Sequence, residues 1–294
     1  MTRQLIVNAD DFGWSAGVNE AVAALYDAGV VMSTSLMVGC PAASEAVRLA
    51  RERPGLAVGL HVTLAGAPAV LSHAEIPHLC DLQGWLPRDW RRAALGYTFH
   101  PAWRRELRRE MEAQFNRFTA LGLRCSHVDT HLHTGLTPAI FSELLPLCRR
   151  FGVEAIRIPE DDFELARRYA PRKMRGHALE ARAMWWLCTR QRVALARAQL
   201  RSPERCYGYF RSGKLEEGYL CRLIEELPEG VRELHCHPDL STESGRAEFE
   251  ALRSGAFRRA LETQNVQLTT YAVLAGNQPK RRSLRESGSG AIQR

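Results

Sequence analysis

Strand-like and helical segments alternate along most of this chain, and this alternation restricts its fold more than any other feature. Short apolar runs predict strands near residues 4–10, 33–38, 57–63, 125–131, 155–158, 205–210, 232–237 and 266–271. Helical patterns fill most of the gaps, and the first helix is expected from Ser15 to Asp27. Because such alternation forms parallel βαβ units, the sequence predicts an α/β fold, a (β/α) barrel that is TIM-like or distorted, with seven or eight strands.

Length and composition are those of an ordinary globular protein. The chain has 294 residues, of which 45% are hydrophobic and 25% charged. We expect one domain over residues 1–276, a long insertion at 65–101, and a disordered tail at 277–294. No apolar run is long enough for a transmembrane helix and no secretory signal opens the chain, so a cytoplasmic location is expected.

The eight cysteines form no Cys-x-x-Cys pair. This spacing predicts neither a disulfide framework nor a zinc knuckle, and most of the cysteines are expected to be small buried side chains. Cys236, between two histidines, is an alternative nucleophile.

Potential metal ligands lie at the ends of several predicted strands. Asp10 and Asp11 end the first apolar run, and His61 lies inside the third. Burying an imidazole is costly unless it is hydrogen-bonded or ligated. A further set recurs with a period of two and would share one face of an extended strand: His127, Asp129, His131 and His133.

These ligand types at strand ends favour a metal-dependent hydrolase on a barrel. Imidazole and carboxylate are the usual ligands of Zn²⁺-like ions, and barrel enzymes place their sites at the carboxyl ends of strands. An open doubly wound sheet would gather ligands mainly at one switch point. Each motif alone also fits a simpler interpretation: the two acids could be a solvated strand end that caps a helix, and each histidine could be a buried side chain with hydrogen-bond partners. Three strands that each carry a potential ligand nevertheless favour a metal site.

Four segments in order along the chain carry a family resemblance: Asn8-Ala9-Asp10-Asp11-Phe12-Gly13, Gly59-Leu60-His61, Ser126-His127-Val128-Asp129-Thr130-His131-Leu132-His133 and Cys236-His237-Pro238. Together they resemble the YdjC-like carbohydrate deacetylases, which remove acetyl groups from N-acetylated sugars on a barrel-like fold related to polysaccharide deacetylases. The resemblance implies metal ligands at Asp11, His61 and His131, with Asp10 as the neighbouring catalytic acid or base. The family often has a longer histidine run where this chain has Leu132.

Within that family the chain is most similar to the hopanoid-biosynthesis-associated deacetylases. Three further segments carry this likeness: Ser33-x-Ser35-Leu36-Met37-Val38-Gly39, Ile156-Arg157-Ile158-Pro159-Glu160 and Gly208-Tyr209-Phe210-Arg211-Ser212-Gly213. The likeness implies an N-acetylglucosamine unit on a hopanoid lipid as substrate.

The chemistry of amide hydrolysis agrees with these residues. A three-ligand metal with an open position supplies a bound water as nucleophile and stabilises the oxyanion. Adjacent strand residues point in opposite directions unless the turn at the strand end relaxes this, so Asp10 is expected to act as the base rather than to share the ion of Asp11. His237 or His133 would protonate the departing amine, with His237 preferred. Asp129 and His127 are candidates to orient the metal ligands through hydrogen bonds, without binding the ion themselves. One ion is expected, Zn²⁺ or Mg²⁺, with Mn²⁺ or Co²⁺ also compatible.

The net charge of +7 is concentrated in one segment. Residues 166–201 hold ten Lys or Arg residues, together with Trp185 and Trp186. This composition predicts a peripheral contact with an anionic membrane, on its inner face; the alternative is a solvated helix whose aromatic residues pack inward. The expected partner of the site is an N-acetylated sugar or glycolipid, and no nucleic acid is expected. Two rival functions are another metal-dependent amidohydrolase or phosphoesterase, and a non-enzymatic lipid- or nucleic-acid-binding protein.

Overall fold

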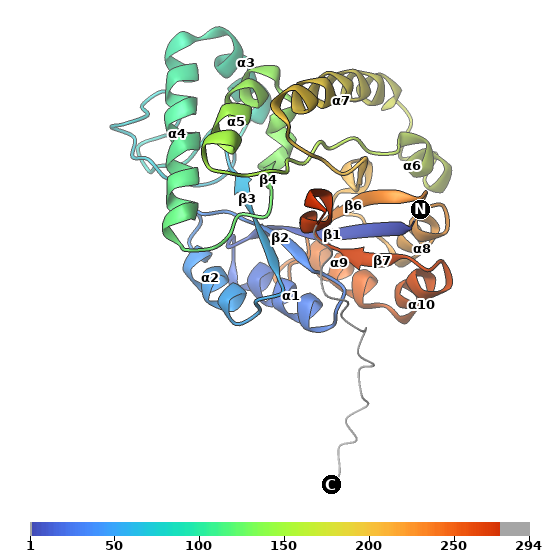
Figure 1. The fold of residues 1–294 in the computed structure, drawn as a ribbon. Coiled ribbons are helices and arrows are strands. Elements are labelled where there is room, and N and C mark those ends of the chain that lie inside the picture. Colours follow the sequence, from blue (N-terminus) through green and yellow to red (C-terminus); the bar gives the residue numbers. More distant parts are fainter. Residues whose placement is uncertain (1, 277–294) are drawn as a thin grey trace.

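The structure, a computed structural model, describes residues 2–276, which fold around a curled sheet of parallel strands (Figure 1). The expected tail at 277–294 lies outside the described residues. The sheet has seven strands in the order β4-β3-β2-β1-β6-β5, and β7 pairs with β1. The strands are β1 (Arg3–Phe12), β2 (Ser33–Leu36), β3 (Ala57–Val62), β4 (Val128–Thr130), β5 (Arg205–Tyr207), β6 (Gly230–Cys236) and β7 (Gln267–Thr269).

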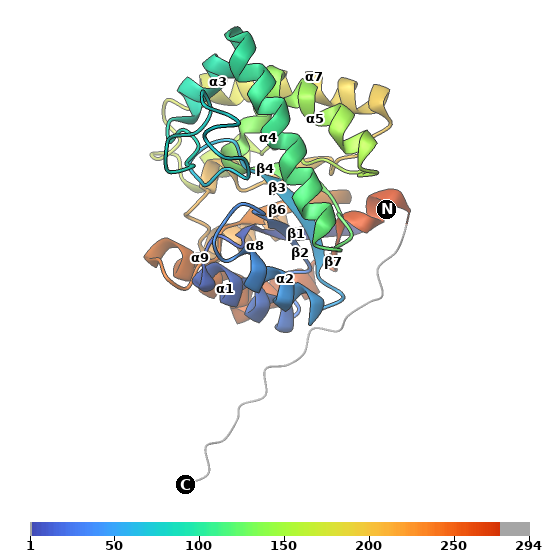
Figure 2. The same cartoon turned by 90° about the vertical axis from the view of Figure 1, so that its left-hand side faces the viewer.

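Helices cover both sides of this sheet (Figures 1 and 2). One side carries α1 (Ala16–Asp27), α2 (Ala43–Arg51), α8 (Glu217–Glu225), α9 (Glu243–Arg253) and α10 (Gly255–Thr263). The other carries α3 (Trp90–Phe99), α4 (Pro101–Ala120), α5 (Pro138–Arg150) and α7 (Ala178–Ala198). The remaining elements are α6 (Phe163–Tyr169) and three short 3₁₀ turns, η1 (His131–Leu136), η2 (Tyr209–Arg211) and η3 (Tyr271–Ala275).

The core lies between the sheet and its helices. Leu5, Ile6 and Val7 of β1 are all at most 1% exposed, as expected for a strand buried on both faces of a parallel sheet. None of the helices within residues 2–276 is long and apolar enough to cross a membrane.

A fully closed eight-stranded barrel is not confirmed, because the expected strand at 155–158 forms only isolated bridges. Ile156 pairs with Val128 of β4, and Ala155 pairs with Arg201. The Cys206 amide of β5 then donates to the Glu160 carbonyl at 3.1 Å. Pro159 has no N–H to continue a ladder. The segment therefore links the two edge strands, β4 and β5, of a half-barrel without becoming a full strand.

The insertion at 65–101 is more ordered than the sequence indicated. Asp89 caps α3 by accepting hydrogen bonds from the amides of Arg91 and Arg92. Upstream, the Val70 and Leu71 amides donate to the buried carboxylate of Glu110 on α4 at 2.8 and 2.9 Å. A helix and buried contacts of its backbone thus hold this insertion against the barrel.

Candidate functional site

Asp10 and Asp11, at the carboxyl end of β1, both face the same site. The register between β1 and β2 shifts between Ala9 and Phe12, and Asp11 has a left-handed backbone with φ of 64°. Asp tolerates this conformation better than most residues. The turn thus relaxes the opposite orientation of neighbouring strand residues, because this irregularity directs Asp11 toward the side that Asp10 faces.

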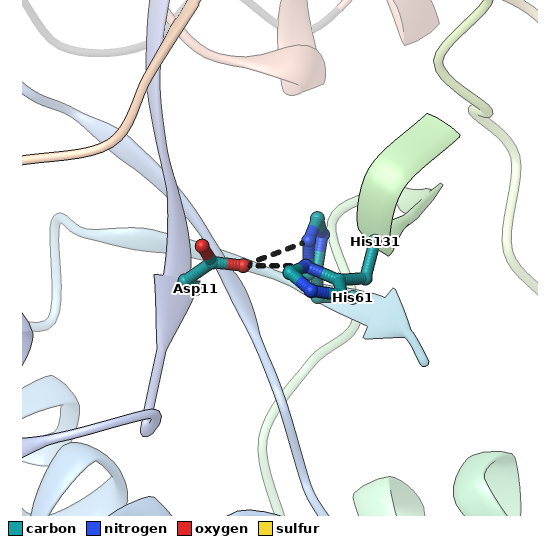
Figure 3. Close-up of side chains that lie close together, drawn as sticks. All are labelled: Asp11, His61 and His131. Atoms are coloured by element: carbon teal, nitrogen blue, oxygen red, sulfur yellow. Dashed lines mark hydrogen bonds and ion pairs between the residues drawn. The ribbon is translucent and has the colours of Figure 1, made fainter. Parts of the chain in front are cut away.

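Asp11, His61 and His131 converge, each from a different part of the fold (Figure 3). The Asp11 Oδ1 atom lies 3.2 Å from His61 Nε2 on β3 and 2.9 Å from His131 Nδ1 at the start of η1. One ligand atom from each residue lies within 4.8 Å of the others. Two imidazoles and one carboxylate fit a divalent ion such as Zn²⁺, so these residues satisfy the chemistry of a metal site.

Asp129 of β4 lies behind His61 and orients its ring. The Asp129 Oδ1 atom is 2.8 Å from His61 Nδ1, and Ser35 donates to the other carboxylate oxygen at 2.9 Å. With the Nδ1 hydrogen directed at Asp129, Nε2 is the atom that would bind a cation beside Asp11. Burial alone would lower the pKa of His61, but Asp129 and Asp11 raise it to about 10. The ring thus lies in an excess of negative charge that a cation would neutralise.

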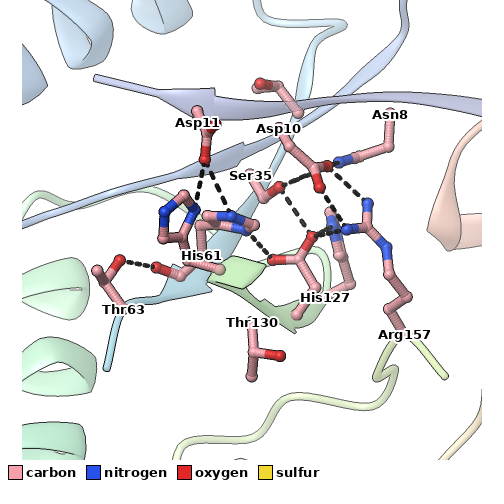
Figure 4. A network of polar contacts seen from close by, with 12 residues as sticks. Asn8, Asp10, Asp11, Ser35, His61, Thr63, His127, Thr130 and Arg157 are labelled. Carbon is pink, nitrogen blue, oxygen red and sulfur yellow. Dashed lines mark hydrogen bonds and ion pairs between the residues drawn. The ribbon is translucent and has the colours of Figure 1, made fainter. Parts of the chain in front are cut away.

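Asp10 is held by a buried arginine. The Nη1 and Nη2 atoms of Arg157 each lie 2.7 Å from an Asp10 oxygen, and Asn8 donates to Oδ1 at 2.8 Å (Figure 4). The same guanidinium is 2.7 Å from Asp129 and 2.7 Å from Glu233. Burial would raise the pKa of Asp10, yet the adjacent Arg157 charge holds it well below its usual range. Asp10 is therefore a carboxylate at neutral pH.

Sequence reasoning assigned no role to Arg157, although a signal was present. The residue interrupts an apolar run between Ile156 and Ile158, and it is only 5% exposed. A charge at a buried strand position requires a partner of opposite charge. The partners are Asp10, Asp129 and Glu233, which come from three strands, β1, β4 and β6.

Of the two predicted proton donors, His237 lies closer to the carboxylate of Asp10. Its Nε2 atom is 3.8 Å from Asp10 Oδ2, and its side chain is 29% exposed. The His133 ring instead lies against the Tyr209 and His235 rings, with centroids 5.2 and 4.8 Å away. Burial lowers the pKa of His133 to about 3. His235, which sequence reasoning did not place in the site, is buried beside it.

The period-two interpretation of residues 127–133 is correct only in part. The strand ends at Thr130, and Leu132 and His133 adopt left-handed conformations inside η1. His127 lies deeper, with its ring stacked on Tyr271 at 3.8 Å and its Nε2 atom 3.9 Å from Asp129, beyond hydrogen-bond distance. The four side chains therefore do not share one ligand set.

Two smaller features have structural explanations. A Cβ at Gly59 would lie 2.4 Å from the His127 ring, which accounts for the glycine two residues before His61. Cys236 is fully buried and burial raises the pKa of its thiol well above the usual value, so it is no candidate nucleophile. All eight cysteines are free, as the sequence predicted.

Exposed side chains border the metal ligands. The Trp14 ring stacks on His131 with centroids 6.4 Å apart and an interplanar angle of 20°, and it is 36% exposed. Leu132 is 45% exposed next to His131 in the chain. An exposed indole beside a polar site offers a flat apolar surface of the kind on which a sugar ring packs.

Comparisons with known proteins show the family to which the chain belongs. A family model described as YdjC-like protein matches residues 4–263, so the chain belongs to the YdjC-like family. It is 40% identical over 152 residues to a carbohydrate deacetylase of Geobacillus stearothermophilus, a match that covers 51% of this chain and 58% of that relative. The chain thus spans less than two thirds of that relative.

Two other similarities extend over nearly the whole chain. A chitooligosaccharide deacetylase of Yersinia enterocolitica is 28% identical over 289 residues, which covers 92% of this chain and 99% of that protein. The crystal structure of an Enterococcus faecalis protein described as a cellobiose-phosphate cleavage protein superimposes with a TM-score of 0.70 at 23% identity, covering 93% of this chain and 99% of that one. The second similarity concerns the fold alone.

Proposed function

We propose that this protein is a metal-dependent carbohydrate deacetylase, which hydrolyses the N-acetyl group of an N-acetylglucosamine-type sugar to a free amine and acetate. The observation that carries the proposal is the convergence of Asp11, His61 and His131 beside an ionised Asp10. Membership of the YdjC-like family and the named activities of the relatives support the same reaction.

Asp11, His61 and His131 would hold the ion, with Asp129 fixing the ring of His61. A divalent ion at this position would polarise the amide carbonyl and make a water acidic enough to lose a proton near neutral pH. The donor set suits Zn²⁺ and admits Mg²⁺, Mn²⁺ or Co²⁺.

Asp10 would act as the general base. Two hydrogen bonds from Arg157 fix its carboxylate in position, on the same side of β1 as Asp11. Because Arg157 keeps the pKa of Asp10 low, this carboxylate is a weak base and requires an acidified water. Arg157 is thus a positioning residue that sets both the direction and the basicity of Asp10.

His237 would protonate the departing amine. It comes from the end of β6, approaches Asp10 to 3.8 Å and retains access to solvent, from which it can be reprotonated. Its backbone amide donates to Glu248 at 2.7 Å, which fixes the turn after the strand. His133 is the weaker candidate, because its low pKa keeps the ring neutral.

We further propose a lipid-linked substrate, an N-acetylglucosamine unit on a hopanoid. The segments that resemble the hopanoid-associated branch contribute to the site: Arg157 binds Asp10, and Tyr209 packs against His133. Gly208 lies so close to β6 that an added Cβ would be 2.6 Å from the His235 carbonyl oxygen. Arg157, Tyr209 and Gly208, which carry the likeness to that branch, therefore each contact a residue in or next to the candidate site.

Acetate release tests both levels of the proposal. The purified protein, loaded with Zn²⁺, Mg²⁺, Mn²⁺ or Co²⁺ in turn, is assayed on chitooligosaccharides, on an N-acetylglucosaminyl lipid and on a phosphate ester. We expect acetate from an N-acetylated substrate and no phosphate release. Activity only on the soluble sugar would refute the proposed lipid-linked substrate. Turnover of the phosphate ester alone would refute the proposed deacetylase activity.

A further inference from the structure

An apolar stripe runs along the exposed side of α7. Leu179, Trp186 and Val193 recur every seven residues, and they are 80%, 50% and 51% exposed. A spacing of seven places side chains on one face of a helix. Trp185, 59% exposed, lies beside this stripe.

The opposite face of α7 binds the helix to the barrel. Met184, Cys188 and Leu195 are buried on that face, and Gln191 donates to the Gly135 carbonyl at 2.7 Å. The alternative in which the two tryptophans pack inward is therefore wrong. In Figure 1 α7 lies along the upper right edge of the molecule.

Three exposed arginines flank the stripe: Arg182, Arg190 and Arg197. Among residues 2–276, no carboxylate forms an ion pair with any of them, whereas Arg192 on the inner side pairs with Glu160 at 2.7 Å. The Arg190 guanidinium lies over the Trp186 ring, 4.4 Å from its centroid. The outward face thus combines unneutralised positive charge with exposed indole and aliphatic groups.

We propose that this face of α7, defined by Leu179, Trp186, Val193 and the three arginines, docks on an anionic lipid membrane. Tryptophan favours the membrane–water interface, and arginine is attracted to anionic headgroups. One face of this 21-residue helix is packed on the rest of the protein and the other carries exposed arginines, so α7 would lie in the plane of the membrane surface rather than cross it.

The inner face of α7 lies next to the candidate site, so only the thickness of this helix separates the site from the docking face. The Tyr209 hydroxyl donates to Glu180 near the start of α7 at 2.9 Å, and the Tyr209 ring packs on His133. Docking through α7 would hold the site close to the lipid surface. Vesicle binding requires no catalysis, so this inference stands independently of the proposed function.

Vesicle flotation of the full-length protein tests the inference. Vesicles of phosphatidylcholine alone are compared with vesicles containing phosphatidylglycerol, at low and high salt. We expect binding to the anionic vesicles only, weakened by salt. Arg190→Glu should weaken it by about fivefold or more, since each basic residue near an anionic surface contributes about that factor. Trp186→Ala should weaken it by about tenfold, through lost apolar burial.

Two control variants match these changes elsewhere on the surface. Arg105→Glu reverses an exposed charge on α4, and Phe99→Ala removes an exposed ring on α3; neither should alter vesicle binding. Circular dichroism checks that every variant folds.

Three outcomes would overturn the proposal. They are equal binding to both vesicle types, equal loss in the control variants, and no binding by the wild-type protein. Sedimentation velocity adds a further decisive result: a dimer that dissociates in Trp186→Ala, without vesicle binding, would identify the face as a contact between two copies of the chain.

Discussion

Asp129→Asn offers the sharpest test of how the candidate metal site is built. Both oxygens of Asp129 are acceptors: Oδ1 faces His61 Nδ1 at 2.8 Å, and Oδ2 accepts from Ser35 at 2.9 Å and lies 2.7 Å from Arg157. An amide of the same shape has one acceptor oxygen and one NH₂ donor. One side of Asp129 must therefore lose its hydrogen bonds, or the His61 ring must change tautomer and turn Nε2–H toward the ion.

The size of the effect follows from these contacts. A hydrogen bond to a charged group is worth about 1.5–3 kcal/mol, and about 1.4 kcal/mol corresponds to a tenfold change in affinity. Residues that hydrogen-bond to a metal ligand typically contribute about 10–100-fold to metal affinity. This range agrees with the one calculated from the hydrogen-bond energy. We therefore expect Asp129→Asn to bind Zn²⁺ about 10–100-fold more weakly than the wild-type protein.

Competition with a chromophoric chelator measures this affinity directly. Asp27→Asn makes the same acid-to-amide change at the exposed end of α1, and it should leave Zn²⁺ affinity unchanged. In a His61→Ala background, Asp129→Asn should have much less effect, because the ring that it orients is absent. Two results would refute the role of Asp129 in orienting His61. One is a Zn²⁺ affinity of Asp129→Asn equal to that of the wild-type protein, and the other is an equal loss of Zn²⁺ affinity in the presence and absence of His61.

Four further results are expected from the same geometry. Asp10→Asn should retain the metal by elemental analysis but lose about 10²–10⁴-fold in kcat, since it removes the proposed base. His237→Ala should lower kcat more than metal affinity, and an unchanged kcat would exclude it as the acid. Trp14→Ala should raise KM for N-acetylated sugars with less change in kcat, because the exposed ring lies beside the site and not within it. Removing the metal with a chelator should abolish acetate release and lower Tm, and restored metal should reverse both, since a ligand of the folded state stabilises it by mass action.

Local patterns predicted the elements of the fold well where one segment determines its own structure. The first helix begins after Ser15, whose side chain accepts from the Val18 amide, as a capping serine should. The apolar run before Asp10 forms β1. The resemblance to the YdjC-like family is confirmed by the match over residues 4–263.

Features that depend on distant residues were not predictable in this way. The left-handed Asp11 accompanies a shift in the pairing of β1 with β2, and a period-two pattern cannot show such a shift. The turn at His131 ends β4 after only three residues, although the sequence continues to alternate. Residues 155–158 have the composition of a strand, but their neighbours β4 and β5 are too short to form a full ladder with them.

The two adjacent acids face different partners, Arg157 for Asp10 and two histidines for Asp11. Arg157 holds Asp10 and Asp129 ionised, and the pKa of both lies below the usual range despite burial. Burial raises the pKa of Glu233, the third carboxylate on Arg157, so one guanidinium does not neutralise all three. Asp11 contacts the two histidines and makes no contact with Arg157 within the described residues. A second cation at Asp11 would balance the remaining negative charge. Arg157 would thus hold Asp10 as the proposed base and leave Asp11 for the proposed metal.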